Sequence, residues 1–527
     1  MSENHTLKAA RAAGMISMMF FISRVLGFIR ENLSGRLFTR FQTDTFFAAF
    51  IIPDAMYYLL VGGALSAAFI PIFTEYLTRG DEDEAWKVAS TFINITVILL
   101  LCFTVLGVTF TRFITPVLAP DFPPDKLQLL IELTRIMFPA VCFTAMAGMV
   151  AGALNSYKHF FAPAVGPIFY NIAIILGAFF LGPKIGIKGM AFGVVVGAVG
   201  NFLIQSCFLW KTGAKDHYRF GYVDLKNKGF RRMLMLMVPA LVGLSADQAN
   251  IWATTAMASA LPEGSITALR FANRLVQLPI GIFAAGISMA FFPLLSSLVA
   301  EKKIEEYKDT LSLALRSIFF LMIPAGIGLI MLRTPIVKLL FEGQLFTTRD
   351  TELTAYALLF YSLTIFAHAA ILMLPRAFYS LQDTRTPVIV SVISVSTSIA
   401  MNFLFLRFTK LGVGGFALSF SIMGLINMLL LLEVLRRKVG GIRGRGMLIS
   451  FIKTTVAALA MGLVIFIIEP MISWISSQLG LHGHLQAALM ILLGMVIGGA
   501  VFFGVAWSLK MEELKMSIDM VRRRFSH

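Results

Sequence analysis

The sequence predicts an all-α protein that crosses a membrane many times, and three observations support this. Of the 527 residues, 57% are hydrophobic and only 14% are charged, a balance typical of polytopic membrane proteins. Apolar runs long enough to span a bilayer recur along the whole chain. Several motifs also recur in the same order in the two halves. We therefore expect about fourteen transmembrane helices, arranged as two six-helix lobes with two further helices at the C-terminal end.

The apolar runs place the expected helices. About 20 consecutive apolar residues suffice for a helix to cross the hydrocarbon core. In chain order, the fourteen runs lie at 9–29, 45–77, 87–111, 127–154, 162–182, 187–210, 232–260, 266–298, 310–332, 351–375, 387–406, 412–435, 448–468 and 485–509.

The distribution of Lys and Arg predicts the orientation of these helices. If the N-terminus is cytoplasmic, most basic loop residues fall on the same side, chiefly in 211–232, in 436–445 and in the tail at 522–524. Short cytoplasmic loops carry an excess of Lys and Arg. We therefore expect both termini in the cytoplasm.

An internal repeat relates the two halves of the chain. Three motifs recur about 222–226 residues later: 64–71 at 286–293, 153–163 at 377–387, and 185–191 at 411–417. Six helices separate equivalent positions, and because six is even, the halves share one orientation and a pseudo-two-fold axis along the membrane normal. The expected domains are an N-lobe (1–215), a C-lobe (216–440), helices thirteen and fourteen (441–510) and a basic cytoplasmic tail (511–527).

Helices two and eight, which are equivalent in the repeat, both contain residues that interrupt helices. The second has Pro53, Gly62 and Pro71, and the eighth has Pro279 and Pro293. Broken helices at matching positions of two halves indicate a transport site. Close packing of small residues is the alternative explanation. We take Pro53, Gly62 and Pro279 as candidate gating residues.

Arginine residues lie at membrane depth in helices one and eight. Arg24 is about 9 Å from the end of its helix, and Arg274 is about 12 Å into helix eight, with Arg270 one turn away on the same face. A central arginine costs about 2.5–3.5 kcal/mol on insertion scales. A polar cavity or a buried anion would offset that cost. The hypothesis is that Arg24 lines a cavity that accepts an anionic substrate.

Acidic and aromatic residues accompany these arginines. Asp44 stands near the outer start of helix two, and Asp247 stands in the outer half of helix seven. The repeat pairs the position of Arg24 with the neighbourhood of Asp247, so mutual neutralisation of the two is an alternative that does not exclude function. Arg30 is either part of the same cavity or a solvated surface residue. Tyr57 either lines the cavity or packs.

The sequence argues against several other classes of function. It contains no Gly-x-Ser-x-Gly motif, P-loop or His-rich metal spacing, so we expect a transporter and not an enzyme, with no cofactor and no metal site. Whether a coupling ion or the membrane potential drives turnover is left open. The formal net charge of +16 is explained by basic loops beside an anionic leaflet and not by nucleic acid binding.

Several segments resemble signature motifs of the lipid II flippases, the MurJ (MviN) family of the multidrug/oligosaccharidyl-lipid/polysaccharide (MOP) exporter superfamily. The similarity covers essentially the whole chain. The matching segments are 21–31, 43–47, 67–71, 272–275 with 278–279, and 378–387.

The resemblance implies a function and a set of partners. The cargo would be lipid II, the undecaprenyl-pyrophosphate-linked peptidoglycan precursor, moved by alternating access from the inner to the outer leaflet of the bacterial cytoplasmic (inner) membrane. Helices thirteen and fourteen would help form a groove for the lipid tail. Membrane lipids and the cell-wall synthesis machinery would be further partners. The expected substrate-binding residues are Arg24, Arg30, Asp44, Arg270 and Arg274, and the expected cavity or gating residues are Asp247, Tyr57, Gly62, Pro53 and Pro279.

The chain departs from the family pattern in two respects. Many relatives carry an arginine pair in place of Tyr57 and Tyr58, and an acid followed by glycine in place of the glycines at 62–63. Carboxylates that some relatives use for sodium correspond to Thr254, Ser398 and Asn402, so a sodium site of that kind is not expected. The alternatives are a multidrug or cation antiporter of the same superfamily, and a membrane enzyme acting on lipid-linked sugars. A cation antiporter would need an anionic cavity.

Overall fold

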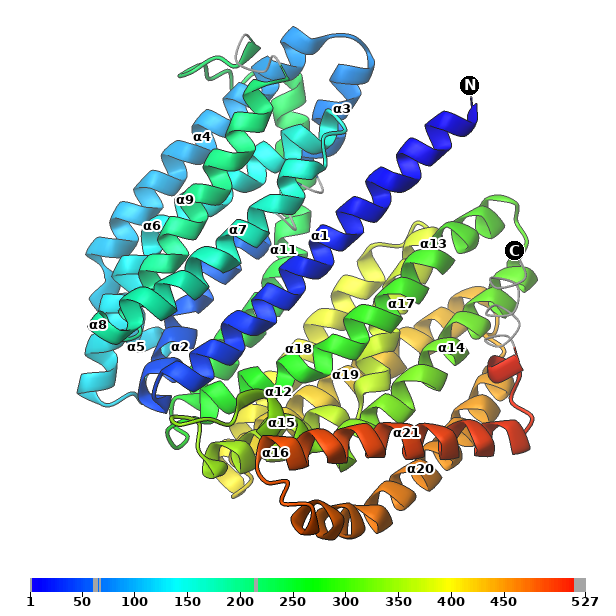
Figure 1. Cartoon of the computed structure of the whole chain (residues 1–527). Coiled ribbons are helices and arrows are strands. Elements are labelled where there is room, and N and C mark those ends of the chain that lie inside the picture. The colour runs from blue at the N-terminus through cyan, green and yellow to red at the C-terminus, as the bar shows by residue number, and fades with distance from the viewer. Residues whose placement is uncertain (1, 60–64, 66–67, 213–216, 516–527) are drawn as a thin grey trace. The chain divides into compact units, whose positions relative to one another are not determined.

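Helices are the regular secondary structure in the part of the chain that the structure describes. The computed structural model describes residues 2–59, 65, 68–212 and 217–515, and no strand occurs in these ranges. The chain divides into two compact units, Met1–Ile266 and Thr267–His527, each built from packed helices (Figure 1). The predicted all-α class is confirmed.

Unit 1 is organised around a long central helix, α6. This helix packs against α2, α4 and α9, while α7 packs against α1 and α9. The elements of unit 1 are α1 (Ser2–Leu37), α2 (Arg40–Tyr57), α3 (Ile70–Thr78), α4 (Glu82–Thr109), α5 (Thr111–Leu118), α6 (Pro124–Ser156), α7 (Phe161–Leu176), the π-helical turn η2 (Gly177–Leu181), α8 (Gly182–Ile185), α9 (Lys188–Trp210) and α11 (Lys228–Ala258).

Unit 2 is organised around α14, which packs against α13, α17 and α20. Helices α20 and α21 pair with each other and reach the rest of the unit through α14 and α15. The elements are α12 (Ser265–Pro279), which begins two residues before the unit boundary, the π-helical turn η3 (Ile280–Ala284), α13 (Ala285–Ala300), α14 (Ile304–Met331), α15 (Arg333–Phe341), α16 (Thr348–Ser362), α17 (Ile365–Ser380), α18 (Arg385–Phe408), α19 (Val413–Val439), α20 (Gly444–Gln478) and α21 (His484–Ser508).

Local sequence signals explain where several helices begin and end. Thr39 and Gln42 form a reciprocal capping box at the start of α2, which satisfies backbone N–H groups that have no partner inside the helix. Asp81 accepts a hydrogen bond from the N–H of Glu84 at the start of α4. Helix α19 ends at Gly440 in the left-handed conformation, after a last turn that contains three basic residues.

Within the described residues, the predicted apolar runs fall on helical segments. Among the described residues, ten helices are long and apolar enough to cross a membrane, or up to eleven when the bent pair α16–α17 is counted as one span. The run at 351–375 is this pair, bent by 49°. Two hydrogen bonds to α19 stabilise the bend. The hydroxyl of Thr364 donates to the carbonyl of Ser421 at 3.0 Å, and the hydroxyl of Ser421 donates to the carbonyl of Phe360. The total of fourteen spans stays a prediction.

The predicted interruption of helix eight is confirmed. Pro279 ends α12, and the five-residue π-helical turn Ile280–Ala284 follows before α13 begins. Proline has no N–H to donate to the preceding turn, which favours such an irregularity. In helix two, Pro53 lies inside α2, and Tyr58 and Leu59 continue as π-helical backbone. Gly62 lies outside the described residues.

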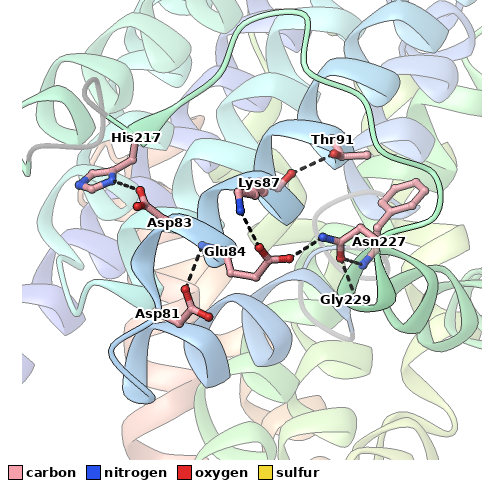
Figure 2. Close-up of polar contacts among 9 residues, drawn as sticks. Asp81, Asp83, Glu84, Lys87, Thr91, His217, Asn227 and Gly229 are labelled. Atoms are coloured by element: carbon pink, nitrogen blue, oxygen red, sulfur yellow. Dashed lines mark hydrogen bonds and ion pairs between the residues drawn. The ribbon is translucent and has the colours of Figure 1, made fainter.

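The segment that joins α9 to α11 is fixed to the start of α4 (Figure 2). His217 Nδ1 lies 3.1 Å from Asp83, and the amide of Asn227 donates to Glu84 at 2.7 Å. Deeper in α4, the amide of Asn94 donates to the carbonyls of Arg219 and Tyr222, each at 3.0 Å. These bonds hold the beginning of α11 within unit 1.

The packing boundary therefore differs from the predicted lobe boundary. The contacts divide the chain after residue 266, whereas the sequence repeat places the boundary between residues 215 and 216. Helix α11 contacts α2, α4 and α5, which are all in unit 1. The repeat-based lobes stay a prediction, because a sequence repeat and a packing unit need not have the same limits.

Candidate functional site

Asp44 lies at the centre of a buried polar node in unit 1. The residue is 1% exposed and belongs to the second turn of α2. Its Oδ2 atom accepts from the ammonium of Lys126 at 3.0 Å and from the backbone N–H of Gly264 at 2.8 Å. Gly264 has a φ of +92°, a conformation that glycine adopts at little cost. The node thus joins α2, α6 and the segment that leads from α11 to α12.

Lys126 was not among the residues that the sequence singled out. It stands one residue before the predicted run at 127–154, where a lysine is typical of the membrane interface. In the structure its side chain is only 6% exposed, and its ammonium lies 4.4 Å from the ring centre of Phe122. The ion pair and the ring together compensate a charge that would otherwise be expensive to bury. Direct binding of substrate by Asp44 stays a prediction.

The arginines of α1 have different surroundings. Arg24 is exposed, so its guanidinium is not sealed in dry packing. The preceding residue, Ser23, accepts a hydrogen bond through its carbonyl from Asn171 of α7 at 3.4 Å. Arg30 is mostly buried: its side chain is 14% exposed, it lies 3.6 Å from the carboxylate of Glu31, and it stands 5.5 Å from the ring centre of Phe50. Arg30 is therefore packed on α2 and is not a solvated surface residue.

The aromatic candidate Tyr57 lies at the end of α2, and the acidic candidate Asp247 lies on α11. Tyr57 and Tyr58 are 46% and 38% exposed. Tyr58 lies within electrostatic range of the carboxylate of Asp247, and Tyr57 lies within range of Asp54. The structure thus brings Asp247 of α11 close to the end of α2. The predicted pairing of Asp247 with Arg24 stays a prediction.

The two candidate arginines of unit 2 lie on α12. Arg270 and Arg274 are one turn apart, and each is partly buried, so they share a face of the helix. Between them, Phe271 is fully buried and stacks on Phe341 with ring centres 4.3 Å apart. This stack holds one side of α12 against α15 and orients the arginine face. The shared chamber for the arginines of both units stays a prediction.

A metal site was not expected from the sequence. Within residues 2–59, 65, 68–212 and 217–515, no group of three or more His, Cys, Asp or Glu residues is placed to hold a metal ion.

Comparison with curated proteins identifies close relatives over nearly the full length. A probable lipid II flippase MurJ of Buchnera aphidicola subsp. Acyrthosiphon pisum is 33% identical over 87% of this chain and 90% of the relative. A probable lipid II flippase MurJ of Vibrio cholerae is 30% identical over 96% of this chain and 97% of the relative.

Comparison with solved structures gives the same picture. A structure of the lipid II flippase MurJ in an inward closed conformation superposes with a TM-score of 0.77 and 26% identity, over 94% of this chain and 99% of the other. An inward-facing multidrug resistance MATE family transporter of the MOP superfamily has a TM-score of 0.68 at 15% identity, over 80% of this chain and 96% of the other. The second match concerns the fold alone. The family model described as lipid II flippase MurJ matches residues 33–484, and the chain therefore belongs to the lipid II flippase MurJ family.

Proposed function

We propose that this chain is a flippase that moves lipid II from the inner to the outer leaflet of the bacterial cytoplasmic membrane, with both of its own termini in the cytoplasm. The observation that carries the proposal is the family match over residues 33–484. The cargo is a peptidoglycan precursor in which a polar glycan–peptide headgroup is joined to a lipid tail by a diphosphate.

A protein path is needed because the headgroup cannot cross hydrocarbon unaided. Each polar group that loses its hydrogen bonds on leaving water costs several kcal/mol, and an unpaired diphosphate costs far more. The lipid tail has no such barrier and can stay in the bilayer while the headgroup moves. The flippase therefore has to supply a polar chamber with a lateral opening.

Arginine is the residue best suited to hold the diphosphate during this movement. Its planar guanidinium donates two parallel hydrogen bonds to phosphate oxygens. In the proposal, Arg24 and Arg30 of α1 and Arg270 and Arg274 of α12 bind the headgroup. The exposure of Arg24 and the partial burial of Arg270 and Arg274 support this assignment.

Asp44 has a second role in the proposal, besides that of a substrate ligand. Its carboxylate already holds the ammonium of Lys126 and the N–H of Gly264. The chain enters unit 2 three residues after Gly264. Asp44 would thus position the start of α12, the helix that carries Arg270 and Arg274.

Alternating access requires helices that can bend, and the interrupted helices offer that freedom. The π-helical turn after Pro279 and the irregular backbone that follows Pro53 in α2 both loosen the regular hydrogen-bond ladder. In the proposal, α12–α13 and α2–α3 bend as the chamber changes the leaflet to which it opens. A coupling ion or the membrane potential would bias this motion.

A reconstituted assay tests the proposal. The full chain is placed in liposomes with fluorescent lipid II, and the fraction accessible to an impermeant quencher is followed with and without a membrane potential. The proposal expects lipid II to become accessible at a rate that depends on the protein. A chain that moves only drug-like cations is an antiporter instead, and one that converts lipid II without moving it is an enzyme; either result overturns the proposal.

A further inference from the structure

A cavity bordered by charged side chains lies in unit 2, and none of the candidate transport residues lines it. Its volume is about 520 Å³. Its walls come from the second to fourth turns of α14 and from the start of α20, and the lining residues include Asp309, Ser312, Arg316, Arg443, Gly444 and Arg445.

The predicted apolar runs place the cavity at the depth of lipid headgroups. The predicted apolar runs of α14 and α20 begin at residues 310 and 448, so both helices enter the membrane next to it. Leu313 also lines the cavity. On the following turns of α20, Leu448, Ile449 and Ile452 are 58%, 46% and 51% exposed. An apolar surface suited to acyl chains thus borders the polar cavity.

Two of the three arginines in the cavity wall are already compensated by carboxylates. Arg443 donates to both oxygens of Asp309, at 2.7 and 3.3 Å, and to Glu305 at 3.1 Å. Arg316 donates to Glu513 at 2.6 Å and to Glu512 at 2.8 Å. These two arginines face four carboxylates, so they shape the wall but leave no positive charge for a ligand.

Arg445 is different. It is exposed, and across the described residues it forms no ion pair. A Cβ atom added at Gly444 or Gly446 would meet nothing within 4 Å, so the space beside these two neighbours of Arg445 is open. The guanidinium of Arg445 thus offers one positive charge, which can pair with a ligand that carries one negative charge. A diphosphate would bring a second charge close to Asp309.

We propose that this cavity binds the headgroup of an anionic phospholipid of the adjacent leaflet, with its single phosphodiester held by Arg445. Acyl chains then lie on the exposed side chains of α20. The site is separate from the proposed translocation site, so its existence does not depend on whether the chain flips lipid II.

Native mass spectrometry on the purified full chain tests this site. The delipidated protein in detergent is titrated with phosphatidylglycerol, with phosphatidylethanolamine and with inorganic phosphate. We expect phosphatidylglycerol to bind most tightly. Arg445→Gln should weaken that binding about tenfold, because a charge-assisted hydrogen bond is lost. Arg436→Gln is the matched control: Arg436 is an exposed arginine of α19 that pairs with Glu433 at 3.4 Å, and its loss should leave the affinity unchanged.

A steric variant keeps the test informative if Arg445→Gln folds poorly. Gly446→Trp places a large ring in the cavity while leaving Arg445 in place, and replacing glycine in the first turn of a helix does not weaken the helix. We expect the same loss of phosphatidylglycerol binding. The proposal is overturned if both variants bind phosphatidylglycerol as the parent does, if phosphatidylethanolamine binds equally well, or if inorganic phosphate alone competes at the same concentration.

Discussion

The ammonium of Lys126 lies 3.0 Å from the carboxylate of Asp44, and the two side chains are only 6% and 2% exposed. The residues are 82 positions apart in the chain. Their ion pair joins α2 to the first turn of α6, and the N–H of Gly264 also donates to the carboxylate.

Loss of one partner of this pair should be strongly destabilising. Lys126→Met removes the ammonium that pairs with a buried carboxylate, and breaking a buried ion pair costs about 3–5 kcal/mol. We expect denaturant unfolding in detergent micelles to show a loss of that size in the free energy of unfolding. The double variant Lys126→Met/Asp44→Leu should be more stable than Lys126→Met alone, because the buried carboxylate is removed together with its ammonium partner.

An exposed ion pair on the same helix provides the control. Lys188 lies 2.8 Å from Glu132 of α6, with side chains 39% and 38% exposed. Lys188→Met should cost less than about 1 kcal/mol. Equal losses for Lys126→Met and Lys188→Met would show that burial of the Asp44 pair has no special role.

Removal of a transport arginine should abolish function without preventing membrane insertion. Arg24→Ala and Arg274→Ala each remove a guanidinium that is proposed to bind the diphosphate. We expect neither variant to restore growth when the resident flippase of a bacterial host is depleted, although both are detected in the membrane fraction. Arg407→Ala, which changes an exposed arginine at the end of α18, should complement fully. Normal growth with both Arg24→Ala and Arg274→Ala would refute the assignment.

The segment at 217–227 should loosen when its anchor on α4 is removed. Asn94 donates to the carbonyls of Arg219 and Tyr222 and accepts from the hydroxyl of Tyr218 at 2.6 Å. Each such bond contributes about 0.5–1.5 kcal/mol, so Asn94→Ala should make local opening about tenfold more frequent. Limited trypsin digestion at Arg219 and Lys226 should accelerate accordingly. Thr109→Val, an exposed change at the far end of α4, should leave the rate unchanged, and equal rates for both variants would argue against the anchor.

The contact between α7 and α9 should not tolerate a methyl group at its closest point. A Cβ atom at Gly193 would lie 2.7 Å from the carbonyl oxygen of Ala173 and 2.7 Å from Cα of Ile174, which are backbone atoms that cannot rotate away. Gly193→Ala should therefore destabilise by about 1–3 kcal/mol, although the same change in an open helix stabilises it. The measurement is thermal unfolding in detergent.

Gly499 of α21 is the matched control, because a Cβ atom there would meet nothing within 4 Å. Gly499→Ala should leave the midpoint temperature of unfolding unchanged or raise it. If Gly193→Ala unfolds at the same temperature as Gly499→Ala, the two helices are not packed as closely as the structure places them.

Asp383, in the turn between α17 and α18, should make the stability of the folded protein depend on pH. Burial alone would raise the pKa of Asp383, but hydrogen bonds from Lys438 and from the backbone and hydroxyl of Thr386 hold it at about 2, below its ordinary value of 3.8. A depressed carboxyl pKa stabilises the folded state above the ordinary pKa, and that contribution is lost as the pH falls toward 2. Lys438→Gln should raise the pKa of Asp383, so the variant should lose less stability than the parent when the pH falls.

Thermal unfolding between pH 2 and pH 7 measures this difference. Lys410→Gln, an exposed change at the other end of α18, should follow the parent curve. The pairing has no energetic role if the Lys438→Gln curve runs parallel to that of the parent at every pH.

The sequence by itself determined the features that depend on local pattern. Apolar runs located the membrane helices because a span needs a minimum length of apolar residues. Pro279 marked the interruption of α12–α13, because a residue without an N–H disturbs the helix wherever it stands. The motifs around Arg24, Asp44 and Arg274 identified the family.

Only the tertiary structure decided which distant groups meet. Lys126 looked like an ordinary interfacial lysine until packing placed it on Asp44. The bend between α16 and α17 depends on Thr364 and Ser421, which lie on different helices. Hydrophobic periodicity reports which face of a segment is buried, but not the partner it is buried against. Contacts between residues far apart in the chain arise when whole helices pack against one another. Only the tertiary structure therefore shows which of these residues meet.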